Sequence, residues 1–324
     1  MTQASKRQFL LDTDVGIDDA LMLIYLAAEP DAEIVAIGSC HGNCSAAQAA
    51  LNTLKVLDVL GLDDVPVAVG AESPLANVIS APHVHGEDGL GDVGIPPSKR
   101  VPSGESAVDQ ILRLGLERPG ELDLVAVGTM TNLGLALERN PQSLTRFRSV
   151  SILGSYSRYP RPGDPHTVDA NVYGSPDLAD RLFTSETPLL VIPVDTTNSV
   201  AFDDEQIARM RTATTPHGRL AWKILPHYFD FYQTILGTWT CRMHDPVVPA
   251  VLLDPSYIED EVHRPLVVEP FEGRHRAIGR DDFRPDSTRR PARIITKVAE
   301  KRLLDRLVLG LELPLGSLPD LDHL

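Results

Sequence analysis

Four aspartates fall within eight residues near the start of the chain, in the segment FLLDTDVGIDDALML. One aspartate at the start of a helix is explained by capping of free backbone N–H groups. Four are not, because crowded carboxylates repel one another and each resists ionisation unless a cation compensates for the charge. Oxygen ligands select Ca²⁺ or Mg²⁺ over zinc. We therefore predict a divalent metal site formed by Asp12, Asp14, Asp18 and Asp19.

The elements around this cluster are expected to hold it at one edge of a sheet. The apolar run Phe9–Leu11 predicts a buried strand, and the nearly all-apolar run Asp18–Glu29 predicts a buried helix. In open α/β sheets, ligands bind at the carboxyl ends of the strands. We therefore expect Asp14 at the floor of a crevice, with Asp18 and Asp19 on the first turn of the helix.

Short apolar runs alternate with longer helical patterns along most of the chain. This alternation is typical of βαβ units, whose right-handed crossovers place helices on both faces of a sheet. We predict an α/β fold with a Rossmann-like, open, mostly parallel sheet, in a single domain over residues 1–324. The predicted strands are Phe9–Leu11, Ile34–Gly38, Val67–Val69, Leu124–Val127, Val150–Leu153 and Leu189–Val194, with a hairpin within Arg264–Ile295. The predicted helices are Asp18–Glu29, Ser45–Leu60, Ser106–Glu117, Leu133–Arg139, Asp177–Thr184 and His217–Gln233.

The composition excludes several classes of partner. The net charge is −15, from 30 basic and 45 acidic residues, and a field of this sign repels phosphate backbones. Nucleic acid is therefore not an expected partner, whereas a neutral small molecule is compatible with the charge. No apolar run approaches the length needed to span a bilayer, so we expect no membrane partner. Three cysteines imply no disulfide framework and fit a cytoplasmic protein.

The segment Asp12–Val15 allows two interpretations. After an apolar strand, it resembles the DxDxV motif of haloacid-dehalogenase-type phosphatases, in which Asp12 would attack phosphorus with Mg²⁺ nearby. That chemistry does not need the Asp18-Asp19 pair, and the chain carries no clear partner motifs of such a phosphatase. The negative charge also disfavours phosphorylated substrates. The rest of the chain favours the other interpretation.

The stretch DTDVGIDDA, Asp12–Ala20, is similar to the DTDxGxDDA signature of the inosine/uridine-preferring nucleoside hydrolases. Four further segments fit that family in the expected order, so that the match runs from about residue 8 to 310. They are His41-Gly42-Asn43, His83-Val84-His85-Gly86, Thr129-Met130-Thr131-Asn132 and His244-Asp245-Pro246. The resemblance implies a calcium-dependent enzyme that cuts a ribonucleoside into base and ribose. It also implies a homodimer or homotetramer.

The resemblance further implies one calcium ion, whose shell two ribose hydroxyls and a water complete. The implied protein ligands are Asp14, Asp19, Asp245 and the backbone carbonyl of Thr131. Calcium accepts carbonyl as well as carboxylate oxygens, and it lowers the pKa of a bound water, whose proton Asp14 can then take. His244 is implied as the acid that protonates the leaving base, since acidic neighbours favour a cationic histidine.

The remaining site residues are implied as contacts to the substrate. Asp18 is expected to accept a hydrogen bond from the ribose 2′-hydroxyl. His83 or His85 either lines the base pocket or braces the loop Gly86–Gly91. For Tyr228 and Tyr232, ordinary core packing is an equally good explanation. The expected contacts are Asn43, His85, Asp169, Asn171, Tyr228, Tyr232 and, with less support, Trp239.

Three positions depart from the family pattern. Val15 stands where proline is common, and Asp169 stands where glutamate usually contacts the ribose 5′-hydroxyl. An asparagine expected for the same hydroxyl is missing, and the chain has Pro162–Pro165 there, with Asp164 or water as possible replacements. The altered 5′ region leaves a second hypothesis open, namely a nucleoside- or ribose-binding protein that keeps the metal site but has no activity.

Overall fold

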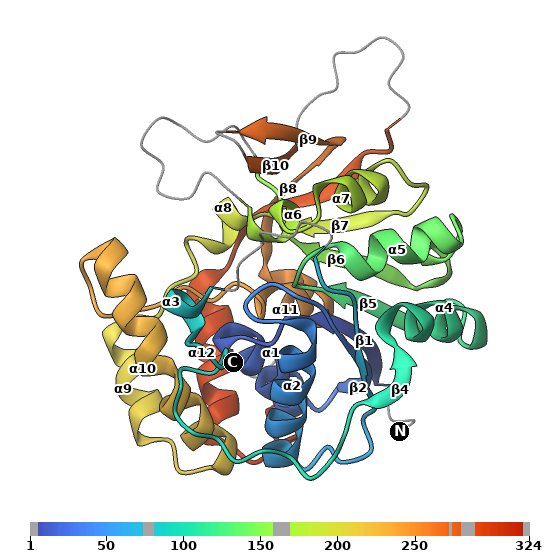
Figure 1. The fold of residues 1–324 in the computed structure, drawn as a ribbon. Coiled ribbons are helices and arrows are strands. Elements are labelled where there is room, and N and C mark those ends of the chain that lie inside the picture. Colours follow the sequence, from blue (N-terminus) through green and yellow to red (C-terminus); the bar gives the residue numbers. More distant parts are fainter. Residues whose placement is uncertain (1–5, 74–80, 158–168, 272–273, 280–288, 320–324) are drawn as a thin grey trace.

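The computed structural model describes residues 6–73, 81–157, 169–271, 274–279 and 289–319 (Figure 1). Strands and helices alternate through most of these residues, as the apolar pattern predicts. The strands are β1 (Arg7–Thr13), β2 (Ala32–Ser39), β3 (Val67–Val69), β4 (Ser103–Ser106), β5 (Leu122–Ala126), β6 (Ser149–Leu153), β7 (Leu189–Ile192), β8 (Ile258–Arg264), β9 (Leu266–Phe271), β10 (Arg274–Gly279) and β11 (Ala292–Val298). The helices are α1 (Ile17–Ala28), α2 (Ala46–Leu60), α3 (Pro82–His85), α4 (Ala107–Glu117), α5 (Thr131–Arg139), α6 (Ala170–Tyr173), α7 (Pro176–Phe183), α8 (Val194–Thr197), α9 (Asp204–Thr212), α10 (Pro216–Leu236), α11 (Val247–Leu253) and α12 (Glu300–Glu312), with 3₁₀ turns at Leu144–Arg146 and Pro255–Tyr257.

A nine-stranded sheet forms the centre of the fold, in the order β4-β3-β2-β1-β5-β6-β7-β11-β8. Its neighbouring strands run parallel, except that β8 pairs with β11 in antiparallel fashion. Strands β9 and β10 form a separate antiparallel pair, which is the hairpin expected late in the chain. The predicted α/β class with an open, mostly parallel sheet is confirmed.

Helices cover both faces of this sheet, and each face has its own hydrophobic core. Helices α1, α2, α9, α10 and α12 contact one another on one face, and α4, α5 and α7 do so on the other (Figure 1). Side chains alternate between the two faces along a strand. In β1, Phe9 and Leu11 therefore join the first core while Leu10 joins the second. This two-sided burial explains why β1 is apolar without alternation.

Helix α1 is the most deeply buried helix next to the acidic cluster. The backbone N–H of Gly16 donates to the carboxylate of Asp19 at 2.8 Å, which fixes the first turn directly after β1. At the other end, Arg306 of α12 forms two hydrogen bonds with Glu29, at 2.8 and 2.6 Å. The position of α1 is thus set at both ends. In the described part of the chain, no helix is long and apolar enough to cross a membrane.

Candidate active site

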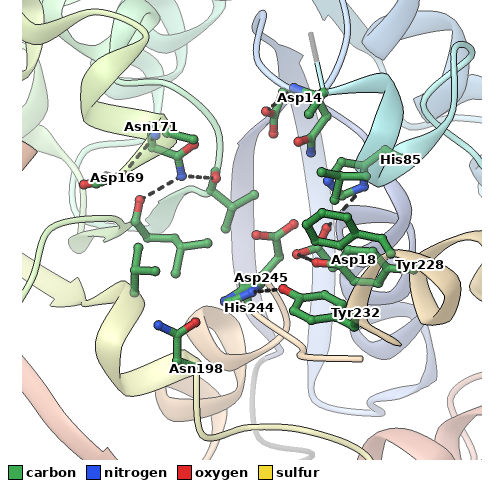
Figure 2. A pocket seen from close by; sticks show the side chains of 18 residues that line it. Asp14, Asp18, His85, Asp169, Asn171, Asn198, Tyr228, Tyr232, His244 and Asp245 are labelled. Carbon is green, nitrogen blue, oxygen red and sulfur yellow. Dashed lines mark hydrogen bonds and ion pairs between the residues drawn. The ribbon is translucent and has the colours of Figure 1, made fainter. Parts of the chain in front are cut away.

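A cavity of about 220 Å³ opens where the central strands end (Figure 2). Strands β1, β5 and β6 are neighbours in the sheet, so the residues that follow or end them meet at one edge. The helices α3 and α10 and the segment before α11 close the other sides. The residues that line it are Asp14, Asp18, Asn43, Ala81, Val84, His85, Val127, Leu153, Asp169, Ala170, Asn171, Val194, Asn198, Tyr228, Phe231, Tyr232, His244 and Asp245.

Four buried carboxylates cluster at this cavity, and three of them, those of Asp14, Asp18 and Asp245, line it. Asp18, Asp19 and Asp245 each present an oxygen within 4.8 Å of the other two. Asp14 lies beside them, and none of the four side chains belongs to a residue more than 5% exposed. Asp245 comes from the segment that leads into α11, more than 200 residues along the chain from the other three. The fold therefore completes a cluster that the N-terminal segment only begins.

These carboxylates cannot all be ionised without a compensating charge. Burial raises the pKa of Asp14 well above its usual range, and the negative charge of Asp19 raises it further. Burial, with Asp19 as second cause, raises the pKa of Asp18 to about 8. Burial and the charge of Asp18 likewise raise the pKa of Asp245. Carboxylate oxygens that are clustered in this way are ionised together only when a cation compensates for their charge, and a hard divalent cation fits such a cluster.

Asp14 is held by backbone that passes very close to it. The N–H of Asn43 donates to Asp14 Oδ2 at 2.8 Å. A Cβ atom on Gly42 would lie 1.8 Å from the same oxygen, so only glycine fits there. A Cβ on Gly128 would lie 3.1 Å from Oδ1, and this glycine follows β5. Asn43 also donates from Nδ2 to Asp19 at 3.0 Å, so one asparagine positions two of the four aspartates.

Thr131, expected to offer its backbone carbonyl to the ion, does not line the cavity, whereas Val127 does. Thr131 is the first residue of α5, and its hydroxyl contacts His41 Nε2 at 3.2 Å, away from the lining. Val127 directly follows β5 and lines the cavity. Its carbonyl oxygen accepts from Asn171 Nδ2 at 2.6 Å. A carbonyl oxygen has two lone pairs, so one remains for another partner.

One side of the cavity is an aromatic wall formed by α3 and α10. The ring of His85 lies 5.2 Å from that of Tyr228, and Tyr228 lies 5.0 Å from Tyr232. The Tyr228 hydroxyl donates to Asp18 Oδ2 at 3.4 Å. His85 Nδ1 accepts from the N–H of Ile17 at 3.2 Å, and burial lowers the pKa of His85 to about 3. His85 is therefore neutral, with its proton on Nε2.

Hydrogen bonds at both ring nitrogens orient His244. The Thr197 hydroxyl donates to the carbonyl of Val194 at 3.2 Å, and Thr197 Oγ1 lies 2.6 Å from His244 Nδ1. Because the hydroxyl has one proton, it accepts from Nδ1–H, which leaves Nε2 as an acceptor in the neutral ring. The Tyr232 hydroxyl lies 2.8 Å from that Nε2 (Figure 2). Tyr232 and His244 thus form one hydrogen-bonded pair that lines the cavity.

Asp169 and Asn171 brace the backbone on the side opposite the aromatic wall. Asp169 Oδ1 accepts from the N–H groups of Asn171 and Val172, at 3.0 and 3.3 Å, and Oδ2 accepts from the N–H of Ser155. Asn171 Nδ2 donates to the carbonyls of Val127 and Leu153, the latter at 3.0 Å. Both side chains line the cavity, but their polar atoms hold strand ends in place. The segment Pro162–Pro165 lies outside the described residues.

Three residues singled out from the sequence lie elsewhere. Trp239 is 40% exposed, packs on Phe229 at 4.6 Å between ring centroids and is absent from the cavity lining, so its expected contact with the base is corrected. His83 packs edge-on against Phe231. Asp12 is 1% exposed and accepts from Asn132 at 2.7 Å. A buried side chain outside the cavity is badly placed to attack phosphorus.

Sequence similarity now decides the family. Residues 9–305 match the family described as inosine-uridine preferring nucleoside hydrolase. The chain belongs to this family. Uridine nucleosidase 1 of Arabidopsis thaliana is 32% identical to this nucleoside hydrolase over 251 residues, which cover 77% of this chain and 74% of the relative. The inosine-uridine preferring nucleoside hydrolase of Leishmania major is 31% identical over 264 residues, 79% of this chain and 81% of the relative.

Solved structures agree with this nucleoside hydrolase over almost its whole length. A plant nucleoside hydrolase superposes with a TM-score of 0.88 at 26% identity, covering 95% of this chain and 99% of the other. A purine-preferring ribonucleoside hydrolase from Gardnerella vaginalis gives 0.86 at 28% identity, covering 94% and 98%. The expected membership, and with it a hydrolase that acts on N-glycosyl compounds, is confirmed.

Proposed function

We propose that this nucleoside hydrolase splits ribonucleosides into base and ribose with one bound calcium ion. The observation that carries the proposal is that a buried carboxylate cluster and the Tyr232–His244 pair face one cavity. The carboxylates suit a sugar that develops positive charge, and the pair suits a base that must gain a proton. Relatives named for uridine and for inosine support both pyrimidine and purine ribonucleosides as candidate substrates.

The proposed calcium ligands are Asp14, Asp19, Asp245 and the carbonyl of Val127. Asp18 also lies within the close group of carboxylates, but one of its oxygens faces the Tyr228 hydroxyl. The other lies 4.0 Å from His85 Nδ1. We therefore assign Asp18 to the ribose 2′-hydroxyl rather than to the ion. Calcium is favoured over magnesium because it accepts more oxygen ligands, carbonyls included, in flexible geometry.

In the proposed reaction, a bound calcium ion would orient the ribose diol and lower the pKa of the attacking water. Asp14 takes the proton from that water, and its hydrogen bond from Asn43 keeps the carboxylate in place. The water oxygen forms a bond to C1′ while the bond from C1′ to the base nitrogen breaks. Asp18 stabilises the positive charge that develops on the sugar ring.

The leaving base receives its proton from the Tyr232–His244 pair. A cationic His244 can donate from Nε2 to the Tyr232 oxygen while the Tyr232 hydroxyl donates to the base. His244 thus supplies the proton through Tyr232, which lines the same cavity. The rings of Tyr228 and His85 offer a flat face for the base, and His85 Nε2–H offers a further donor.

The test is a panel of uridine, cytidine, inosine and adenosine, assayed with metal-stripped protein and after addition of Ca²⁺, Mg²⁺ or Zn²⁺. We expect base release that disappears on stripping and returns best with Ca²⁺. Calorimetric titration of the ions, on wild type and on Asp14→Asn and Asp18→Asn variants, separates the ligands: the first variant should lose affinity strongly and the second less. Nucleoside binding without turnover would instead support the non-catalytic hypothesis.

A further inference from the structure

Asn198 lines the cavity, but the chemistry proposed above does not use it. It follows directly after α8, one residue beyond the Thr197 that holds His244. Its side chain is part-buried and points into the pocket at the end away from Asp14 (Figure 2). An amide N–H group that lines a substrate cavity is placed to contact the substrate.

Arg242 fixes which end of the Asn198 amide faces the cavity. Its Nη1 donates to Asn198 Oδ1 at 2.8 Å, and a guanidinium can only donate. The amide oxygen therefore faces Arg242, and Nδ2 faces away from it. Among the described residues, no hydrogen bond from Nδ2 is formed. Arg242 is itself held beside the ring of Tyr232, 5.8 Å from its centroid. Asn198 thus presents a pre-oriented hydrogen-bond donor.

The position of Asn198 assigns this donor to one end of a ribonucleoside. With the 2′,3′-diol at the carboxylates and the base at the aromatic wall, the 5′-carbon is attached at C4′, across the ring oxygen from C1′ and the base. Away from the aromatic wall, the cavity is lined by Asp169, Asn171 and Asn198 (Figure 2). In Figure 2, the Tyr232–His244 pair separates Asn198 from Tyr228 and His85.

Asp169 leaves the 5′-oxygen without the acceptor that the sequence suggests. Within the described part of the chain, its carboxylate accepts three hydrogen bonds, all from backbone N–H groups, one of them on Ser155. A Cβ on Gly154 would lie 3.1 Å from Asp169 Oδ2, so the Gly154–Ser155 backbone packs directly against this carboxylate. Asn198 Nδ2 offers a hydrogen-bond donor that these backbone contacts leave available.

We propose that Asn198 Nδ2 donates a hydrogen bond to the 5′-oxygen of the ribonucleoside, with Arg242 as the positioning residue. This inference rests on the proposed function. The 5′-oxygen then contributes to specificity as a hydrogen-bond acceptor. A carboxylate at this place would instead require the 5′-hydroxyl to donate.

The experiment compares kcat/KM for uridine and 5′-deoxyuridine, which lacks only the 5′-oxygen. Wild type should favour uridine, and Asn198→Leu, similar in shape but without a donor, should lower the ratio roughly three- to tenfold. Arg242→Met should lower it less, and the double variant should match Asn198→Leu alone. Ser199→Ala changes an exposed neighbour outside the cavity and should keep the wild-type ratio.

The possible results separate this inference from the proposed function. A ratio near one in wild type, or an unchanged ratio in Asn198→Leu, overturns the role of Asn198 while base release continues. Absence of base release from every ribonucleoside, in wild type with calcium, contradicts the proposed function and removes this inference with it. Equal losses on both substrates in Asn198→Leu would show a structural role only and also overturn it.

Discussion

At the scale of single residues, Asp14 has two tasks in the proposed reaction, and its surroundings allow both. One oxygen is fixed by the N–H of Asn43, so the carboxylate does not turn when a water loses its proton to it. Without a metal ion, burial and the neighbouring aspartates raise the pKa of Asp14. A cation nearby keeps it ionised. The same carboxylate can therefore hold an ion and accept a proton.

Asp14→Asn should fold and lose nearly all turnover. The amide keeps an oxygen for the Asn43 N–H, but it can neither take a proton nor compensate a cation. We expect kcat to fall by about three orders of magnitude, within the range for loss of a general base. Steady-state rates and a thermal melt measure the two effects. A variant with wild-type kcat would remove Asp14 from the mechanism.

Tyr232 stands between His244 and the cavity, so its hydroxyl should matter only where the leaving group needs a proton. Tyr232→Phe should lower kcat on uridine or inosine by roughly a hundredfold. It should affect p-nitrophenyl β-D-ribofuranoside far less, because p-nitrophenolate leaves without protonation. Tyr228→Phe is the matched control, since its hydroxyl faces Asp18 and should alter both substrates alike. Equal losses for Tyr232→Phe on the two substrates would contradict the relay.

At the scale of elements, the strand ends could be predicted from the sequence, whereas the site residues outside the strand ends could not. The apolar runs locate β1 and β5 to within two residues, and the end of a parallel strand is where ligands bind. The motif around Thr131 carries no information on which backbone carbonyl faces the cavity. Helix α5 already begins at Thr131, and the residue of this segment that lines the cavity is four positions earlier, at Val127. The strand predicted to end at Val127 already places this residue at the edge of the sheet where ligands bind.

Residues that reach the site only through long-range packing cannot be recognised from local sequence patterns. Trp239 and Tyr232 are both aromatic and close in sequence, yet Tyr232 faces the cavity from α10 whereas Trp239 follows the end of that helix and packs outside. Asn198 belongs to the site because Arg242, more than forty residues later, turns its amide. A contact of that separation is not visible in local patterns of polarity.

Asp169 is expected from the sequence to contact the substrate, but its carboxylate caps a helix and holds a neighbouring backbone segment. Its carboxylate caps α6 and also holds Ser155, so Asp169→Ala leaves three N–H groups without their acceptor. We expect a loss of about 2 kcal/mol in the free energy of unfolding, measured from urea midpoints. Asp203→Ala removes the exposed cap of α9 and should cost about half as much. Equal costs would contradict a buried bracing role for Asp169.

At the scale of the whole molecule, the carboxylate cluster joins segments that are far apart in the chain. Asp14 and Asp19 belong to the β1–α1 junction, whereas Asp245 leads into α11. An ion held by all three would connect these parts of the fold. Binding to the folded state alone stabilises a protein by about 2.7 kcal/mol at a ligand concentration of 100 Kd. The metal should therefore contribute to stability as well as to the reaction.

The stabilisation by metal should grow with pH. In the folded, metal-free protein the pKa of Asp18 is raised to about 8, against an ordinary value of 3.8, so between these values the folded state binds more protons than the unfolded one. Stability of the metal-free protein then falls as pH rises through this window. Bound calcium compensates the ionised carboxylates and removes most of that loss. Thermal melts at pH 5, 6.5 and 8, with stripped and calcium-saturated protein, should show a widening gap in Tm. The Asp245→Asn variant, which lacks one ligand, should show a much smaller gap at every pH. A gap in Tm that narrows with pH in wild type would contradict the assignment of the ion to this cluster.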